Sequence, residues 1–196
     1  MPILDKNGNP IAYHEIFPGD VEVNNIEFGA GRNNYGKIEY PNCYVTDLSY
    51  PAELKSYFQE YEDDNTDYHY LDNICDFYNT NFGRQFENII LCNPYGYGFY
   101  GLAAAKKFFD RAGEILIENG LIHILGKNNN KWSKKESFDK FIKNDVITVY
   151  QSKYDFKLES FETLDSEHDI NVKYKFYTTG LLTETIPNER LIIKKL

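Results

Sequence analysis

The chain has 196 residues, a length that fits one domain with a buried core. It carries 21 Lys and Arg against 30 Asp and Glu, and its net charge of −9 argues against tight, sequence-independent binding of DNA. Its three cysteines contain no CxxC pair and its four histidines show no ligand spacing, so we predict neither a disulfide framework nor a metal site. No signal peptide and no apolar stretch of ~18 residues is present, so we expect a cytoplasmic protein without a membrane segment.

Turn-forming residues dominate the start of the chain. Asn7-Gly8-Asn9-Pro10 and Pro18-Gly19-Asp20 are typical of loops, and no strand or helix periodicity joins them. We therefore divide the chain into an irregular N-terminal lead-in, residues 1–22, and a single domain, residues 23–196. No later linker or change of composition marks a second boundary.

The first half of the domain alternates strands with loops and one helix. The apolar run Ile89-Ile90-Leu91-Cys92 is typical of a strand that is buried on both faces. Pro51, after a capping serine at Ser49, is typical of a helix start. The predicted strands are residues 23–28, 43–47, 68–72 and 89–92, and the predicted helix starts over residues 51–58.

The second half contains the clearest helix. Apolar residues recur at helical spacing from Gly101 to Asn119, and Gly120 stands where a C-terminal glycine is expected. Apolar strands separated by helices indicate an α/β fold with a mostly parallel sheet, covered on both faces. The remaining predictions are strands at 121–125 and 146–150, a short helix at 137–143, and an antiparallel edge from strands near 156–164 and 172–179.

Two polar motifs follow predicted strands. Glu27-Phe28-Gly29-Ala30-Gly31 places glycines directly after the first strand, where the backbone can approach a ligand. Asp47 follows 20 residues after Glu27, at the tip of the second strand, where a carboxylate can reach a ribose diol. The fourth strand runs into Asn93-Pro94-Tyr95-Gly96, an amide, a fixed φ and an aromatic ring at one corner.

In this order the motifs resemble those of the class I S-adenosylmethionine-dependent methyltransferases, over about residues 23–179. The resemblance implies a Rossmann-like methyltransferase sheet and S-adenosylmethionine as the cofactor. It also implies the residues that bind the cofactor. These are Glu27, Gly29 and Gly31 under the methionine part, Asp47 and Leu48 at the ribose, and Asp72 and Asn73 beside the adenine.

The corner Asn93-Pro94-Tyr95 resembles the Asn-Pro-Pro-Tyr type of fourth motif, found in members that methylate planar amino or amide nitrogens. By this resemblance the Asn93 side chain and the Pro94 carbonyl accept hydrogen bonds from the target nitrogen, and Tyr95 stacks on its plane. These three are the predicted catalytic residues. We expect a methyltransferase of bacterial type that acts on a nitrogen of a small or nucleotide-containing substrate.

Three departures from the family pattern leave an alternative open. Tyr95 replaces the second proline, Asn33 replaces the third glycine, and residues 32–42 lack the periodicity of a helix after the first motif. Either that helix is reduced to a turn or the cofactor pocket is altered. The alternative is a non-catalytic methyltransferase-like binding protein. A nicotinamide-dependent oxidoreductase is a weaker interpretation, because the glycine pattern is short.

Two segments bear on the substrate and the biological role. Six lysines between Lys127 and Lys143, with Trp132 among them, form either a solvated helix face or a surface that steers a phosphate-bearing substrate such as an RNA. Residues 4–13 resemble the junction that precedes C-terminal toxin domains of bacterial polymorphic toxins. The pattern favours a plain surface hairpin over such a junction, and a secreted effector domain and a housekeeping enzyme both stay open. The sequence gives no oligomeric state.

Overall fold

The computed structural model describes residues 3–4, 10–11, 23–30, 35–47, 72–94, 96, 98–143, 146–147, 152–164, 174–178, 181–185 and 188–196. The predicted helix at 51–58 lies outside these ranges. Three predicted site residues, Gly31, Leu48 and Tyr95, also lie outside them.

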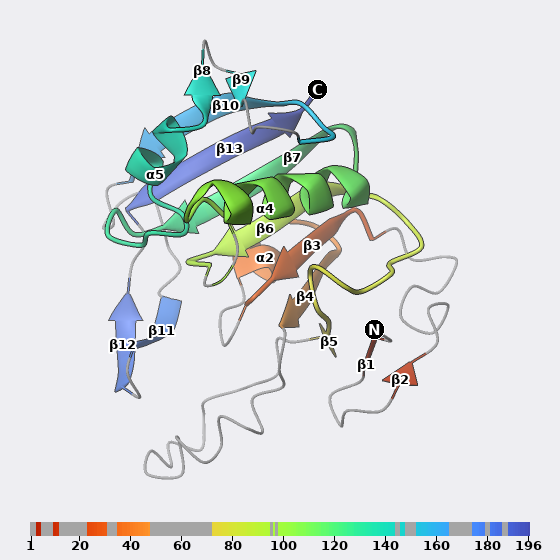
Figure 1. Cartoon of the computed structure of the whole chain (residues 1–196). Helices are drawn as coiled ribbons and strands as arrows, with labels where there is room; N and C mark the ends of the chain where they lie inside the picture. The colour runs from red at the N-terminus through yellow and green to blue at the C-terminus, as the bar shows by residue number, and fades with distance from the viewer. Residues whose placement is uncertain are drawn as a thin grey trace.

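A parallel sheet forms the centre of the fold (Figure 1). Its five parallel strands are, in spatial order, β5 (Asn73–Ile74), β4 (Cys43–Asp47), β3 (Asn25–Phe28), β6 (Phe86–Cys92) and β7 (Leu116–Gly126). The predictions for the first, second and fourth strands are confirmed. Most of the strand expected at 68–72 lies outside the described residues, and the described strand β5 starts at Asn73.

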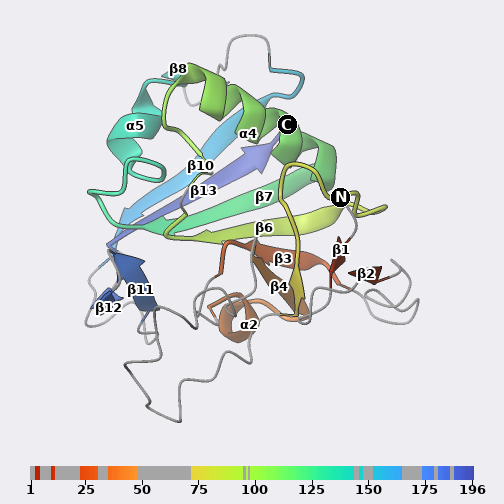
Figure 2. The same cartoon turned by 60° about the horizontal axis from the view of Figure 1, so that its bottom comes forward.

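Antiparallel strands complete one side of this sheet. Four strands follow β7 in spatial order: β13 (Glu189–Lys195), β10 (Phe156–Thr163), β9 (Val146–Ile147) and β8 (Ile142–Lys143). In Figure 2, β13 points opposite to β6 and β7. The predicted α/β architecture, mostly parallel with an antiparallel edge, is therefore confirmed.

The residues that supply the antiparallel pairing differ in part from those expected. The segment 172–179 contains β11 (Tyr174–Thr178), which pairs with β12 (Leu181–Thr185) in a separate two-stranded sheet. The strand β13 was not predicted. Its alternation is disguised because Lys195 occupies a buried position, where its Nζ donates to the Leu116 carbonyl at 3.0 Å and pairs with Glu118 at 2.8 Å.

The expected N-terminal lead-in contains two short strands. β1 (Ile3–Leu4) pairs antiparallel with β2 (Pro10–Ile11), and Leu4 pairs with Ile74 of β5. The lead-in therefore extends the sheet beyond its last parallel strand.

The long helix ends earlier than its sequence suggests. α4 (Leu102–Ile115) gives way directly to β7, because Leu116 is extended, with φ −95° and ψ 142°. Leu116 pairs with Phe86 and Leu121 pairs with Asn88, so residues 117–120 loop out of the ladder. Gly120 serves this loop rather than capping the helix, since a Cβ there would lie 3.1 Å from the Glu87 carbonyl oxygen.

The two faces of the sheet are covered differently. Figure 2 shows α4 on one face and α2 (Tyr35–Glu39) on the other. The α4 face holds the main core, which contains ten phenylalanines, so most Phe residues fill the interior rather than line a groove. The opposite face holds a smaller cluster around Tyr35, Val45 and Ile90. A second short helix, α5 (Lys135–Asp139), begins two residues before the predicted one and ends four residues earlier.

The described residues contain neither a candidate membrane span nor a candidate metal site. None of their helices is long and apolar enough to cross a membrane. No group of three or more His, Cys, Asp or Glu side chains among them could hold a metal ion.

Candidate active site

The carboxyl ends of the parallel strands meet along one edge of the sheet. β3 pairs with β4 on one side and with β6 on the other. The chain passes from β3 outward to β4 and β5, and later from β6 outward to β7 on the other side. Open α/β sheets bind ligands at such a reversal of strand order. The loops after β3 and β6 are therefore the candidate site.

The loop after β3 turns at Gly29. Gly29 has φ 66°, which a glycine adopts without steric cost, and the following Ala30 N–H donates to the Thr46 carbonyl at 3.1 Å. The chain thus bends toward β4 immediately after Phe28. Gly29 thus lies at a turn directly after the strand, and the role predicted for the first motif stays a prediction.

Glu27 is fully buried and anchors α2 to the sheet. Its Oε2 accepts a hydrogen bond from the Gly36 N–H at 2.8 Å. A Cβ on Gly36 would lie 2.5 Å from that oxygen and 2.7 Å from the Cys43 sulfur, so only glycine fits. The helix after the first motif is therefore a five-residue turn held by the motif's acid. The reduced helix is the first of the two outcomes that the sequence left open.

Asp47 lies beside the glycine turn. It is the last residue of β4, and its neighbour Thr46 pairs with Phe28, the residue before Gly29. The side chain is half-buried at the edge of the sheet. This placement fits a carboxylate that binds a diol above the Gly29 turn.

Asp72 lies farther from this edge. Its Oδ1 is 2.7 Å from the Lys37 ammonium, and its Oδ2 accepts from the Val45 N–H at 2.8 Å. Both oxygens thus tie α2 and β5 to β4. Asn73 pairs with Thr46 through the backbone, and its side chain lies outside the description. The adenine-side role of both residues stays a prediction.

The corner after β6 holds two acceptors that point at one donor. Asn93 has φ 48°, and its N–H donates to the Leu125 carbonyl at 2.6 Å. The Nδ2 of Asn130 donates to Asn93 Oδ1 at 2.7 Å and to the Pro94 carbonyl at 3.0 Å. Asn130 Oδ1 accepts from the Trp132 N–H at 2.9 Å, which fixes the orientation of its amide.

Asn130 is the site residue that sequence reasoning missed. It comes from the loop after β7, next along the same edge of the sheet. The only signal was the run Asn128-Asn129-Asn130 shortly after a buried strand. Three equivalent amides in a row gave no means to choose among them, because the choice depends on how the loop folds over the corner.

Residues 98–101, a segment of glycine and aromatic residues that follows the Asn93 corner, are hydrogen-bonded to the loop that contains Asn130. Gly98 has φ 107°, and a Cβ there would lie 2.2 Å from the Trp132 carbonyl oxygen. The next residue, Phe99, donates its N–H to that carbonyl at 3.1 Å and packs its ring 4.8 Å from Phe138. Phe99 thus anchors the segment in the core, while Tyr100 is exposed.

Burial shifts the pKa of three ionisable groups near this region in the direction that favours their neutral forms. Burial raises the pKa of the Cys75 thiol to about 12. Burial, with a smaller effect of Arg190, lowers the pKa of His123 to about 4. Cys43 and Cys92 are buried free thiols as well, and burial also raises the pKa of Cys43. Cys43, Cys75 and His123 are therefore not poised as nucleophiles or general bases at neutral pH.

Gly29 and Asp47 are thus the described residues whose positions fit the predicted cofactor. Glycine is required by the positive φ of the turn, and the carboxylate stands next to it. The chemistry of this pair suits a ligand that combines a close backbone contact with a ribose diol. Gly31 and Leu48 lie outside the described residues.

Comparison with solved structures identifies the fold. No protein-family model and no curated protein sequence matches the chain. A variant of the 16S rRNA (adenine(1408)-N(1))-methyltransferase from Catenulisporales acidiphilia matches with a TM-score of 0.57 and 9% identity, over 100% of this chain and 97% of that chain. The antibiotic-resistance methyltransferase Kmr matches with a TM-score of 0.57 and 9% identity over 100% of both chains.

Larger structures match as well. The CurJ carbon methyltransferase matches with a TM-score of 0.45 and 13% identity over 93% of this chain and 50% of that chain. The chain spans about half the length of this and the other first matches. The two matches that are covered over nearly their whole length are both methyltransferases. From these matches and its strand order, the chain has the fold of the class I S-adenosylmethionine-dependent methyltransferases.

Proposed function

We propose that the protein is an S-adenosylmethionine-dependent methyltransferase that modifies a planar nitrogen of a small or nucleotide-containing substrate. One observation carries the choice of nitrogen. Asn93 Oδ1 and the Pro94 carbonyl converge on a single amide NH2 group, that of Asn130, at 2.7 and 3.0 Å. A corner that binds one planar NH2 has the acceptor geometry to orient another.

In this proposal, the residues at the carboxyl ends of the parallel strands have separate roles in binding the cofactor and the target. The cofactor, when bound, supplies an electrophilic methyl group on a sulfonium. Gly29 allows the backbone to approach it, and Asp47 accepts hydrogen bonds from its ribose hydroxyls. Asn93 and Pro94 accept hydrogen bonds from the target nitrogen through the lone pairs that Asn130 leaves open, since each carbonyl oxygen has two. Tyr95 stacks on the plane of the target.

Orientation is the main catalytic contribution in this arrangement. The bound cofactor would supply the methyl group, Asn93 and Pro94 would hold the target nitrogen toward it, and the proton of that nitrogen would leave to water. Burial favours the neutral forms of Cys43, Cys75 and His123 through their pKa values, so we assign these groups no part in the transfer. Holding a nucleophile in line with the group that it attacks can lower a barrier by several kcal/mol, about 7 or more in well-oriented cases.

Calorimetry with S-adenosylhomocysteine tests the cofactor assignment. We expect binding by the wild type and a loss of roughly tenfold or more in Asp47→Ala, because a charge-assisted hydrogen bond is removed. Asp155→Ala is the matched control, since Asp155 is an exposed carboxylate just before β10, where the strand starts, away from the carboxyl edge. Absence of binding by the wild type, or equal binding by Asp47→Ala, would refute the assignment.

A non-catalytic binding protein is the second candidate, and the five-residue α2 favours it. A shortened helix after the first motif removes part of the wall that faces a cofactor. Asn93→Ala separates the two functions. A methyltransferase loses transfer of labelled methyl groups to cell extract while it keeps cofactor binding, whereas a binding protein shows no transfer in either form.

The effector role suggested by residues 4–13 has its own test. Expression of the wild type in bacterial cells should arrest growth if the domain is a toxin, and Asn93→Ala should restore growth. Equal growth with both forms would assign the protein to an ordinary cellular role.

A further inference from the structure

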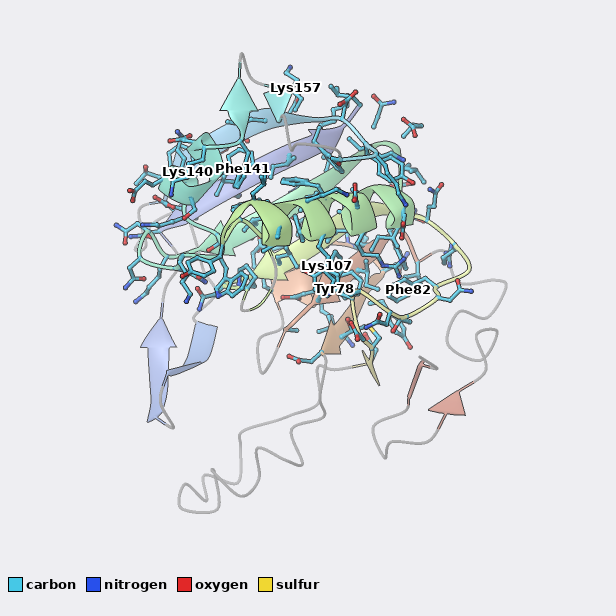
Figure 3. The ribbon with its side chains drawn as sticks, in the orientation of Figure 1. Tyr78, Phe82, Lys107, Lys140, Phe141 and Lys157 are labelled. Atoms are coloured by element: carbon cyan, nitrogen blue, oxygen red, sulfur yellow. The ribbon has the colours of Figure 1, made fainter. Side chains whose placement is uncertain are left out.

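A pocket of about 510 Å³ lies beside the candidate active site. Its walls come from three segments: the loop between β6 and α4 with the first residue of α4, the loop between β7 and α5, and α5 with the two residues that follow it. Figure 3 shows Lys140 and Phe141, two of its lining residues, near α5. The volume lies within the range of about 300–1,000 Å³ that is usual for small-ligand sites.

One side of the pocket is apolar and open to solvent. Tyr100 and Leu102 are 54% and 52% exposed, while Phe99 and Phe141, which also line the pocket, are buried. The described residues include only four exposed large apolar side chains, and two of them meet here. An exposed tyrosine ring with an aliphatic neighbour forms a platform on which a planar ring can stack.

The other side of the pocket is positively charged. Lys131, Lys134 and Lys140 line it, and no Asp or Glu is among the lining residues, although the chain as a whole carries a net charge of −9. The Lys131 ammonium lies over one face of the Tyr100 ring, 4.2 Å from its centroid. Cation and aromatic platform are thus adjacent.

Among the described residues, no buried carboxylate pairs with the ammonium group of any of the three lysines. Lys134 pairs with Glu136 at 2.8 Å, but Glu136 is highly exposed, and such surface pairs contribute little. Within the described ranges, Lys140 forms no ion pair. A ligand that brings phosphate to these ammonium groups therefore displaces no buried partner.

The pocket is connected to the Asn93 corner through shared loops. Asn130 joins the two loops at the corner, and the Phe99 N–H and Trp132 carbonyl join them again at 3.1 Å. The Tyr100 and Trp132 rings lie 5.3 Å apart at the pocket side of this contact. A ligand in the pocket and a target nitrogen at Asn93 are held by the same two segments.

We propose that this pocket binds a nucleotide unit, with its base on Tyr100 and Leu102 and its phosphate on Lys131, Lys134 and Lys140. The inference rests on the proposed methyl transfer, for which it names the substrate class: a nucleotide, either free or within single-stranded RNA. A planar ring joined to an anion is the chemistry that a stacking platform beside three ammonium groups recognises.

Trp132 supplies a direct readout, because it is the only tryptophan of the chain and its ring neighbours Tyr100. Its fluorescence is followed during titration with adenosine 5′-monophosphate, with a ten-nucleotide single-stranded RNA and with inorganic phosphate. The experiment needs no methyl transfer. S-adenosylhomocysteine binding is measured in parallel by calorimetry on the same variants.

We expect a saturable fluorescence change with the nucleotide or the RNA, and a much weaker one with phosphate alone. The double variant Lys131→Gln/Lys140→Gln should weaken binding by about tenfold or more and reduce its salt dependence. Tyr100→Ala should weaken it by at least about fivefold through lost stacking. Matched controls are Lys157→Gln, an exposed lysine on β10 (Figure 3), and Ile117→Ala, an exposed apolar residue outside the pocket.

The source of the ligand follows from the affinities. Binding of RNA at least tenfold tighter than of the monophosphate assigns the pocket to a strand, and equal binding assigns it to a free nucleotide. No fluorescence change, a change of equal size with phosphate alone, or equal binding by the pocket variants and the controls would overturn the proposal. S-adenosylhomocysteine binding that persists in those cases leaves the methyltransferase assignment standing. Nucleotide binding without S-adenosylhomocysteine binding would overturn only the methyltransferase assignment.

Discussion

The Nδ2 of Asn130 donates a hydrogen bond to Oδ1 of Asn93 at 2.7 Å, so an amide from the loop after β7 sets the direction of the amide after β6. Without this donor, the Asn93 side chain would be free to rotate its carboxamide. The bond thus connects the folding of one loop to the orientation of the residue on which the proposed reaction depends.

Asn130→Ala should therefore lower kcat by about tenfold with little change in KM, since a hydrogen bond of this kind contributes about 1–1.5 kcal/mol. Asn130→Asp should be worse, because its carboxylate would face two carbonyl oxygens. Asn129→Ala is the control, as Asn129 is exposed in the same loop. The measurement is transfer of labelled methyl groups to the acceptor found in extract. A rise in kcat or a fall in KM would show instead that Asn130 competes with the target.

Substitutions at Gly98 and Gly96 form a matched pair that tests the contact between the loop after β6 and the loop after β7. Both have positive φ, 107° and 83°, but a Cβ on Gly98 would lie 2.2 Å from the Trp132 carbonyl oxygen, whereas a Cβ on Gly96 meets nothing within 4 Å. We expect Gly98→Ala to lower the free energy of unfolding by about 3 kcal/mol or more. Gly96→Ala should cost about 1–2 kcal/mol, from backbone strain alone.

Urea denaturation gives both values, and Trp132 fluorescence of the folded protein should change in Gly98→Ala only. Equal destabilisation by the two substitutions would mean that the loops are not in contact at Trp132.

Gly36→Ala tests the anchor between Glu27 and α2. The added methyl group would lie 2.5 Å from Glu27 Oε2 and 2.7 Å from the Cys43 sulfur, and it would displace a buried carboxylate. We expect a loss of about 2–3 kcal/mol in the free energy of unfolding. Glu39→Ala, at an exposed position of the same helix, should change it by less than about 0.5 kcal/mol. Similar values for both variants would contradict the contact.

His123 should make the protein less stable in mild acid. Its Nε2 lies 2.8 Å from Asn88 Oδ1, and burial is the main cause that lowers its pKa from 6.5 to about 4. A histidine with a depressed pKa in the folded state takes up its proton more readily when unfolded. Stability is therefore full above pH 6.5 and falls as the pH is lowered toward 4, by up to about 3 kcal/mol.

The check is a series of urea denaturation curves between pH 7.5 and pH 4. His123→Gln removes the titrating group while it keeps a donor for Asn88, so its stability should fall less steeply over that interval. Identical slopes for the wild type and the variant would place the acid sensitivity elsewhere.

Local sequence patterns were sufficient to predict a strand or helix wherever the element was regular. The strand Cys43–Asp47 has the predicted bounds, and the predicted core of β6 and β7 is confirmed, because apolar runs of this kind have one stable environment, the middle of a parallel sheet. The end of α4 could not be predicted. Its helical pattern continues past Ile115, and only the pairing of Leu116 with Phe86 stops it.

The sequence by itself determined the first, second and fourth predicted strands and the polar residues at their ends: Gly29 after the first, Asp47 on the second and Asn93 after the fourth. These are consequences of local chemistry, since a glycine turn, a terminal acid and a proline corner need no distant partner. Only the tertiary structure decided which amide faces Asn93, what Glu27 anchors, and that the Lys131 loop and Tyr100 enclose one pocket. Those contacts join segments that are far apart in the chain or belong to separate loops, and the distance between two side chains follows from the packing of the whole sheet rather than from either segment.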